Sequence, residues 1–130
     1  MGPARARNLT LDSGGLVALE RRSGRMRRLL TLAMQRGVSI YIPAGVLAQV
    51  WRGGPRQQPL AALLAEEHVD VVSLDQAAAK VVGELCGQQG TDDVVDASVA
   101  LCARVTRSVV ITSDPDDLRR LDPRLAIEVI

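Results

Sequence analysis

Short apolar runs and helically spaced apolar stripes alternate along the whole chain. The runs, rich in β-branched residues, predict strands at residues 8–11, 38–42, 69–72, 108–112 and 126–130. Apolar residues spaced three or four apart predict helices at residues 15–20, 26–36, 44–51, 59–67, 74–88, 90–103 and 118–121. Because strands alternate with helices, we expect an α/β fold of three layers, with a mostly parallel central sheet of about five strands.

Carboxylates stand at the ends of two of these runs and at the start of one helix. Asp12 and Asp114 each follow a predicted strand by at most two residues, and Asp92, Asp93 and Asp96 open the helix predicted at 90–103. A single acid at a helix start is usually an N-cap or a partner of the helix dipole. Three within five residues exceed what capping needs. Since ligands bind beyond the carboxyl ends of parallel strands, these acids are expected to converge on one cleft if the two strands are neighbours.

Converging carboxylates favour a divalent metal ion. Two unit charges 4 Å apart repel by about 4 kcal/mol at an effective dielectric near 20. Added protons or a cation relieve this repulsion. A ligand set of oxygens alone, without His or Cys, favours Mg²⁺, or Mn²⁺ in its place, over zinc. Such an ion lowers the pKa of a water and stabilises displacement at phosphorus, so the pattern indicates phosphodiester hydrolysis.

Three short motifs carry a resemblance to a known family. Asp12 after the first strand, residues 96–100 (DASVA) at a helix start and residues 112–118 (TSDPDDL) after a late strand resemble the PIN-domain nucleases, in particular the VapC-type toxins of bacterial toxin-antitoxin pairs. The resemblance covers residues 9–130. It implies a PIN-like fold and a Mg²⁺-dependent endoribonuclease that acts on RNA, forms a homodimer and is inhibited by a small antitoxin protein.

The same resemblance assigns roles to individual acids. It makes Asp12, Asp96 and Asp114 metal-binding residues, with Asp116 or Asp93 as an additional acid. The predicted catalytic residues are Asp12, Asp93, Asp96 and Asp114, and the predicted metal ligands are Asp12, Asp96, Asp114 and Asp116. No residue is expected to bind another cofactor.

Gln49 departs from the family pattern. The family usually has a glutamate in the helix after the second strand, where this chain has Gln49. An amide oxygen can ligate a metal but brings no negative charge. Asp93 is a candidate for the missing charge, and Glu20 a more distant one. This departure supports an alternative: a catalytically weakened PIN-like module that binds RNA or a protein. A phosphoacceptor receiver domain is a poorer match. It needs a phosphorylatable Asp after the third strand and a Lys after the fifth, whereas here Asp75 is badly placed and no lysine stands after the fifth predicted strand.

Composition adds limits to these expectations. The chain has 130 residues, 47% of them hydrophobic and 24% charged, with a net charge of +1, which fits one globular domain at residues 8–130 after a disordered lead at residues 1–7. No signal peptide or membrane-spanning run is evident, so a reducing cytoplasm is expected, and Cys86 and Cys102 are predicted to be buried thiols.

Three remaining features have a structural and a functional interpretation. The arginines between Arg21 and Arg28 fit a solvated helix face better than a phosphate track, although they could form a rim for substrate or antitoxin. His68, the only histidine, is expected on the surface. Trp51 is expected to pack in the core or a dimer interface rather than stack on a base.

Overall fold

A central sheet of five parallel strands organises the molecule. The computed structural model describes residues 7–130, so most of the predicted lead lies outside the described residues, and Arg7 has no regular secondary structure. The strands follow the order β3-β2-β1-β4-β5, and every neighbouring pair is parallel. They are β1 (Asn8–Leu11), β2 (Ile40–Pro43), β3 (Val69–Val72), β4 (Ser108–Thr112) and β5 (Ile127–Val129).

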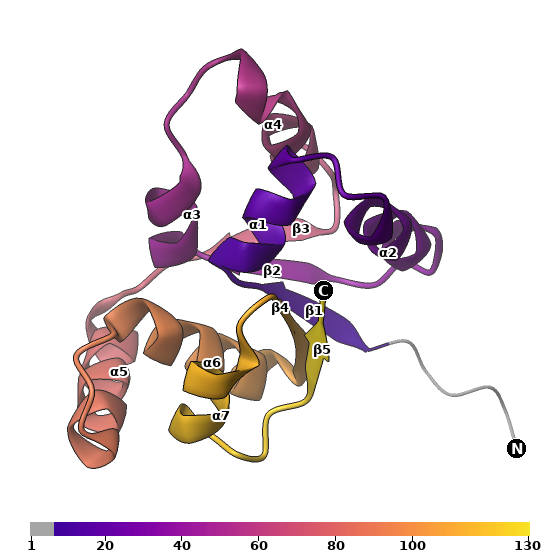
Figure 1. The fold of residues 1–130 in the computed structure, drawn as a ribbon. Helices are drawn as coiled ribbons and strands as arrows, with labels where there is room; N and C mark the ends of the chain where they lie inside the picture. The colour runs from indigo at the N-terminus through magenta and orange to yellow at the C-terminus, as the bar shows by residue number, and fades with distance from the viewer. Residues whose placement is uncertain (1–6) are drawn as a thin grey trace, which may run out of the picture.

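Helices cover both faces of this sheet (Figure 1). One layer contains α1 (Ser13–Glu20), α2 (Gly24–Gln35), α3 (Ala44–Val50) and α4 (Gln58–Leu64), the last preceded by a 3₁₀ helix at Pro55–Gln57. The other contains α5 (Gln76–Gln89), α6 (Val94–Thr106) and α7 (Pro115–Leu121). The predicted three-layer α/β/α fold is therefore confirmed.

Burial explains why the strands lie in the middle. Leu11, Ile40, Ile42, Val110 and Ile111 are fully buried, because helices pack on both faces of β1, β2 and β4. A second buried cluster joins α5, α6 and α7. Parallel strands covered on both faces need apolar residues on both faces, which is why these runs hardly alternate.

The chain reverses its winding direction between β1 and β4. From β1 it proceeds to β2 and β3 on one side, and it returns to place β4 and β5 on the other. Four residue pairs fix the register of β1 against β4, from Asn8 with Ser108 to Leu11 with Ile111. The carboxyl ends of these two strands therefore stop side by side, and this is where ligands bind in open parallel sheets.

Several local expectations can be compared with the structure. Cys86 and Cys102 are buried free thiols and His68 is exposed, as predicted. Core packing of Trp51 is wrong, because this side chain lies at the exposed end of α3 and retains 41% of its surface. Pro43 ends β2 and occupies the N-cap position of α3. Within residues 7–130, no helix has the length and apolar character that crossing a membrane requires.

Candidate active site

Asp12 lies at the junction of β1 and α1 and is held there by the backbone. Its carboxylate accepts a hydrogen bond from the N–H of Gly15 at 3.0 Å, so Asp12 is the N-cap of α1. Only 7% of the residue is exposed. Burial raises the pKa of Asp12 above its ordinary value, and the negative charge of Asp114 adds to this, while hydrogen bonds from Thr112, Gly15 and Gly14 partly offset it. The carboxylate is therefore fixed in place but costly to ionise.

Thr112, at the end of β4, links the two strand ends through its hydroxyl. This hydroxyl hydrogen-bonds the Asp12 carboxylate and accepts a hydrogen bond from the backbone N–H of Asp114 at 3.0 Å. The side chain is completely buried, which leaves it no competing contact with solvent. A single threonine thus sets the position of Asp12 relative to the backbone that carries Asp114. The sequence analysis missed this residue, whose only signal is its place between an apolar run and an acidic turn.

Gly14 allows the two turns to approach one another. A Cβ atom at Gly14 would lie 2.3 Å from Ser113 Oγ and 3.1 Å from Ser113 N. A side chain at this position would require the Ser113 hydroxyl to turn aside and the β4–α7 turn to shift by a few tenths of an ångström. The glycine therefore lets the segments that carry Asp12 and Asp114 lie close together.

The first turn of α6 adds two more carboxylates. Asp93 is the N-cap, and its Oδ1 accepts a hydrogen bond from the N–H of Asp96 at 3.0 Å. Thr91 in turn accepts a hydrogen bond from Asp93 N through its hydroxyl, at 3.1 Å. Asp93 and Asp96 therefore lie on the same side of the helix start, and it is Asp93 that caps the helix.

Asp96 has the most perturbed carboxyl of the cluster. Its pKa is raised to about 7, first by burial, then by the charge and hydrogen bonding of Asp93, and finally by the charges of Asp117 and Asp12. Groups from α1, α6 and α7 therefore act on a single carboxyl. Such a site holds more negative charge than it can accommodate without a proton or a cation.

The acids after β4 divide into two groups. Asp114 acts electrostatically on Asp12, and Asp117 acts on Asp96. Asp117 also pairs with Arg120 at 3.5 Å. Asp116 is exposed in the first turn of α7, and it is absent from the groups that perturb Asp12 or Asp96. Of the two neighbouring acids, the structure thus brings Asp117 to the cluster, which the sequence analysis had not selected.

The donor set fits a hard divalent cation, but no closed cage is preformed. The converging groups are all carboxylates, which suit Mg²⁺ or Mn²⁺. In the part of the chain that the structure describes, no three acidic, histidine or cysteine groups already surround one point closely enough to hold an ion. Asp96 is only partly buried and Asp114 is exposed, so both side chains have room to turn inward. Gln49 is exposed on α3.

Comparisons with known proteins agree with the fold. No curated protein sequence matches the chain. It resembles a chain in the crystal structure of VapBC2 from Rickettsia felis bound to a DNA fragment from their promoter, with 19% identity, a TM-score of 0.71 and coverage of 94% of this chain and 98% of that one. It also resembles a chain of DNA-bound VapBC from Salmonella typhimurium, with 19% identity, a TM-score of 0.67 and coverage of 95% of this chain and 98% of that one. For a chain of FitAcB from Neisseria gonorrhoeae the identity is 16% and the TM-score 0.59, with coverage of 92% of this chain and 95% of that one.

A family model also matches most of the chain. The family model described as "PIN domain" matches residues 9–123, which include all the acids discussed above. The matched segment begins within β1 and ends after α7. This chain therefore belongs to the PIN domain family.

Proposed function

We propose that the chain is a divalent-metal-dependent endoribonuclease and the toxin of a VapC-type toxin-antitoxin pair. One observation carries the proposal: carboxylates from three distant segments converge beyond β1 and β4, where burial first and then the neighbouring acids raise the pKa of Asp96 to about 7. A fold that only needed capped helices would not concentrate this charge. Membership of the PIN domain family supports the same conclusion.

Asp12, Asp96 and Asp114 are the residues that would hold the metal ion, with Asp116 or Asp93 as an additional acid. Mg²⁺ is the expected ion, with Mn²⁺ as a substitute. When bound, the ion would polarise the phosphodiester and lower the pKa of an attacking water. The coupling of Asp117 to Asp96 makes Asp117 a further candidate for this group.

The residues of the chain would position and tune this chemistry. The N–H groups of Gly14 and Gly15 and the Thr112 hydroxyl keep Asp12 in one orientation, so that it need not reorganise when substrate binds. The Asp96 carboxyl exchanges its proton near neutral pH while no cation is present. A bound cation would favour the ionised form, so that Asp96 would serve as a negatively charged ligand.

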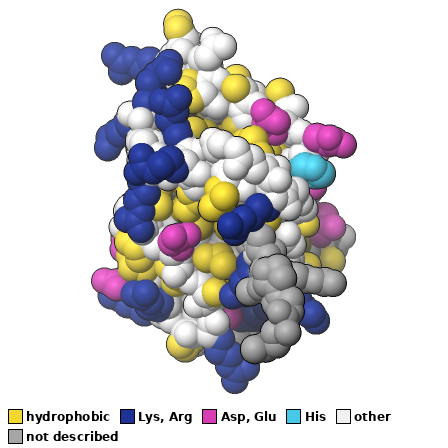
Figure 2. Space-filling view, turned by 90° about the vertical axis from the view of Figure 1, so that its right-hand side faces the viewer, with side chains coloured by type: hydrophobic (Ala, Val, Ile, Leu, Met, Phe, Trp, Pro, Cys, Tyr) yellow, Lys and Arg dark blue, Asp and Glu magenta, His cyan; other side chains and the backbone are white. Residues whose placement is uncertain are grey.

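RNA is the proposed substrate and the cytoplasm the proposed location, both by family resemblance. Exposed arginines supply positive charge for phosphates outside the acidic cluster. On the face seen in Figure 2, Lys and Arg side chains form a band along one side. In the α1–α2 region the exposed arginines are Arg21, Arg22, Arg25, Arg27 and Arg28. Such a band favours a polyanion over a neutral substrate.

An antitoxin and a second copy of the chain are the proposed protein partners. The chain resembles components of VapBC and FitAcB assemblies. A hollow of about 170 Å³ between α2 and α4 is lined by Leu30, Met34 and Leu63 together with one arginine and one glutamate, Arg27 and Glu66, and suits an apolar segment of the antitoxin. On another face, Leu74 and Val105 are exposed over a second hollow of about 230 Å³, which we propose contributes to a homodimer.

Cleavage of RNA by wild type and Asp96→Asn tests the enzymatic proposal. With added Mg²⁺, wild type is expected to cut a single-stranded RNA and the variant to lose most of its activity, by about 100-fold or more. Asp70→Asn, which neutralises an exposed acid on β3, is the matched control and keeps its activity. Equal rates for wild type and Asp96→Asn would refute the proposal.

The weakened binding module remains the second candidate, because Gln49 brings no charge and no closed cage is preformed among the described residues. Calorimetric titration with Mn²⁺ separates the two. Saturable binding that Asp96→Asn abolishes supports the enzyme. Absence of binding at millimolar Mn²⁺, together with retained RNA or protein binding, supports the module.

A further inference from the structure

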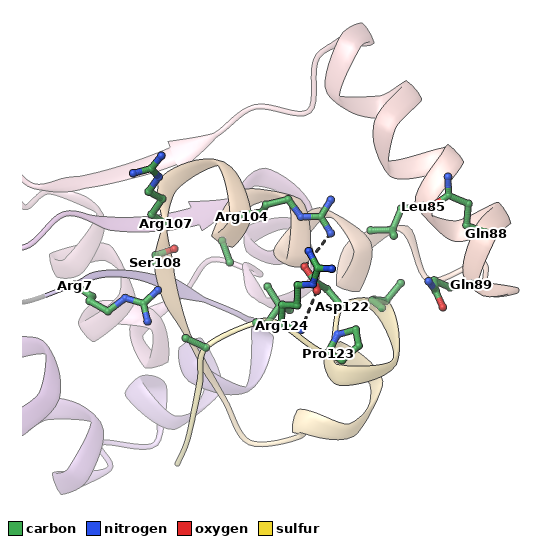
Figure 3. Close-up of a pocket in the computed structure, with 14 residues that line it drawn as sticks. Arg7, Leu85, Gln88, Gln89, Arg104, Arg107, Ser108, Asp122, Pro123 and Arg124 are labelled. Atoms are coloured by element: carbon green, nitrogen blue, oxygen red, sulfur yellow. Dashed lines mark hydrogen bonds and ion pairs between the residues drawn. The ribbon is translucent and has the colours of Figure 1, made fainter.

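A pocket lined by arginines lies away from the acidic cluster, near the amino end of β4, whereas the acids lie beyond its carboxyl end. It is bounded by Arg7 before β1, by Ser108 at the start of β4, by the ends of α5 and α6, and by the loop between α7 and β5, and its volume is about 710 Å³ (Figure 3). Along α6, Asp96 and Thr106 are separated by about 15 Å at 1.5 Å per residue, and Arg107 follows the end of the helix. The two sites are thus spatially distinct.

Positive charge dominates the lining. Four arginines (Arg7, Arg104, Arg107 and Arg124) face a single acid, Asp122, which leaves three net positive charges. Among the described residues, only Arg104 of these four pairs with a carboxylate, at 2.9 Å from Asp122. The other three guanidinium groups retain their donors for a ligand.

A buried carboxylate fixes part of this arrangement. Asp122 is 8% exposed, and it accepts hydrogen bonds from the Arg104 side chain at 2.9 Å and from the backbone N–H of Arg124 at 2.9 Å. Burial alone would raise the pKa of Asp122, but these two hydrogen bonds and the two arginine charges outweigh it and lower the pKa. Asp122 therefore stays ionised and orients both arginines, one through its side chain and one through its backbone.

Shape and charge together select the ligand. A concave pocket of this volume lies within the range of small-molecule sites. Guanidinium groups bind phosphate oxygens in bidentate pairs, and three net charges match several phosphates in one compact group better than a single phosphate. Figure 3 shows Arg104 and Arg124 beside Asp122, with Arg7 across the pocket from them. Leu85 and Pro123 contribute apolar wall, and among the described residues no aromatic side chain lines the pocket to stack a base.

We propose that this pocket binds a compact polyphosphate group, such as the triphosphate of a free nucleotide or of an RNA 5′ end. Recognition is of the phosphates and not of the base. The site needs neither the carboxylate cluster nor a metal ion, so it stands or falls independently of the nuclease activity.

Binding of inorganic triphosphate in EDTA tests the proposal. Calorimetry with the full chain is expected to give one saturable site, with orthophosphate at the same ionic strength binding about tenfold more weakly or worse. Arg7→Gln/Arg124→Gln should weaken triphosphate binding by about tenfold or more, since each charge-assisted hydrogen bond contributes strongly. Arg56→Gln/Lys80→Gln, which removes two exposed positive charges that lie outside both the pocket and the arginine band of the α1–α2 region, should leave the affinity unchanged.

A second variant covers the case in which the first fails to fold. Gln88→Glu adds a negative charge to the pocket from the exposed end of α5 and should weaken triphosphate binding without touching Asp122. Equal affinity in wild type, the pocket double variant and Gln88→Glu would overturn the proposal. An equal loss in Arg7→Gln/Arg124→Gln and Arg56→Gln/Lys80→Gln would also overturn it, because binding would then follow overall charge.

The source of the phosphates is distinguished by further ligands. ATP and GTP that bind as tightly as inorganic triphosphate, with the same loss in Arg7→Gln/Arg124→Gln, identify a free nucleotide. An RNA with a 5′-triphosphate that binds more tightly than the same RNA with a 5′-hydroxyl, with that difference abolished in the pocket variant, identifies an RNA end.

Discussion

Neutralising Asp96 is expected to stabilise the metal-free protein. The pKa of this carboxyl is raised from 3.8 to about 7. Each pKa unit corresponds to about 1.4 kcal/mol, so the full shift amounts to roughly 4 kcal/mol of destabilisation once the group is ionised. Because the carboxyl is only partly buried, solvent screening reduces this to about 2 kcal/mol. Asp96→Asn should therefore unfold about 2 kcal/mol less readily than wild type at pH 8 without metal.

The sign of the pH dependence follows from proton uptake. Between 3.8 and about 7 the folded chain binds more protons at Asp96 than the unfolded chain does. Stability of the wild type contributed by this group is therefore lost as the pH rises through that window. The asparagine in the Asp96→Asn variant has no proton to lose, and its amide can still donate to Asp93. The difference between variant and wild type should thus vanish near pH 4 and reach its full size near pH 8.

Urea unfolding in EDTA at both pH values measures this difference. For a chain of this length, a gain of about 2 kcal/mol also corresponds to a rise in Tm of roughly 8 °C. Asp70→Asn serves as the control, since the residue is exposed on β3, and it should match wild type at both pH values. Added Mg²⁺ should stabilise wild type more than Asp96→Asn. A variant no more stable than wild type at pH 8, or equally more stable at pH 4, would refute the reasoning.

Two further substitutions test how the cluster is assembled. Thr112→Val removes the hydroxyl that orients Asp12 and accepts a hydrogen bond from the backbone N–H of Asp114. We expect this variant to lower the free energy of unfolding in urea by about 1 to 3 kcal/mol and to slow RNA cleavage, and we expect Thr112→Ser to keep both near the wild-type values. A Thr112→Val variant equal to wild type would contradict this. Gly14→Ala would place a Cβ atom 2.3 Å from Ser113 Oγ unless the turn adjusts, so it should lower the urea midpoint of unfolding. Gly14→Ala/Ser113→Gly should recover part of the loss. An unchanged midpoint in Gly14→Ala would show that the two turns are not closely packed.

The sequence predicted the acidic cluster where local pattern and sheet geometry coincide. Asp12 and Asp114 follow apolar runs by at most two residues, those runs are typical of buried strands, and the carboxyl ends of parallel strands lie on the same side of a sheet. Asp93 and Asp96 stand at the start of a long amphipathic helix. What local pattern did not provide was the adjacency of β1 and β4, which are about 100 residues apart and pair only because the chain reverses its winding.

The sequence pattern could not decide which of Asp116 and Asp117 acts on Asp96. The sequence predicted a helix only from Leu118, so both acids lay in a loop with no defined direction. In the structure α7 begins at Pro115, and both residues become part of its first turn. Successive helical residues point about 100° apart. A three-residue difference in the helix start therefore decides which carboxylate acts on Asp96.

The arginines also show that the sequence reveals a local cluster but not a site built from distant residues. The conspicuous cluster between Arg21 and Arg28 is local, so the sequence reveals it at once. The arginine pocket combines residues 7, 104, 107 and 124, whose separation leaves no pattern to recognise. Its organising group, Asp122, resembles an ordinary turn acid until Arg104 of another helix is placed beside it. Only tertiary structure can reveal a site built in this way.

The two ends of α6 allow structural and functional charge to be separated. Asp96 lies in its first turn and Arg104 in its last, an arrangement that complements the helix dipole. Dipole complementation therefore accounts for one acid and one base at these positions. It does not account for the acids from α1 and α7 that raise the pKa of Asp96, nor for the arginines that reach the other site from outside α6. Because this excess charge opposes folding, its presence at both edges of the sheet favours ligands of opposite charge there: a cation at the acids and a polyphosphate at the arginines.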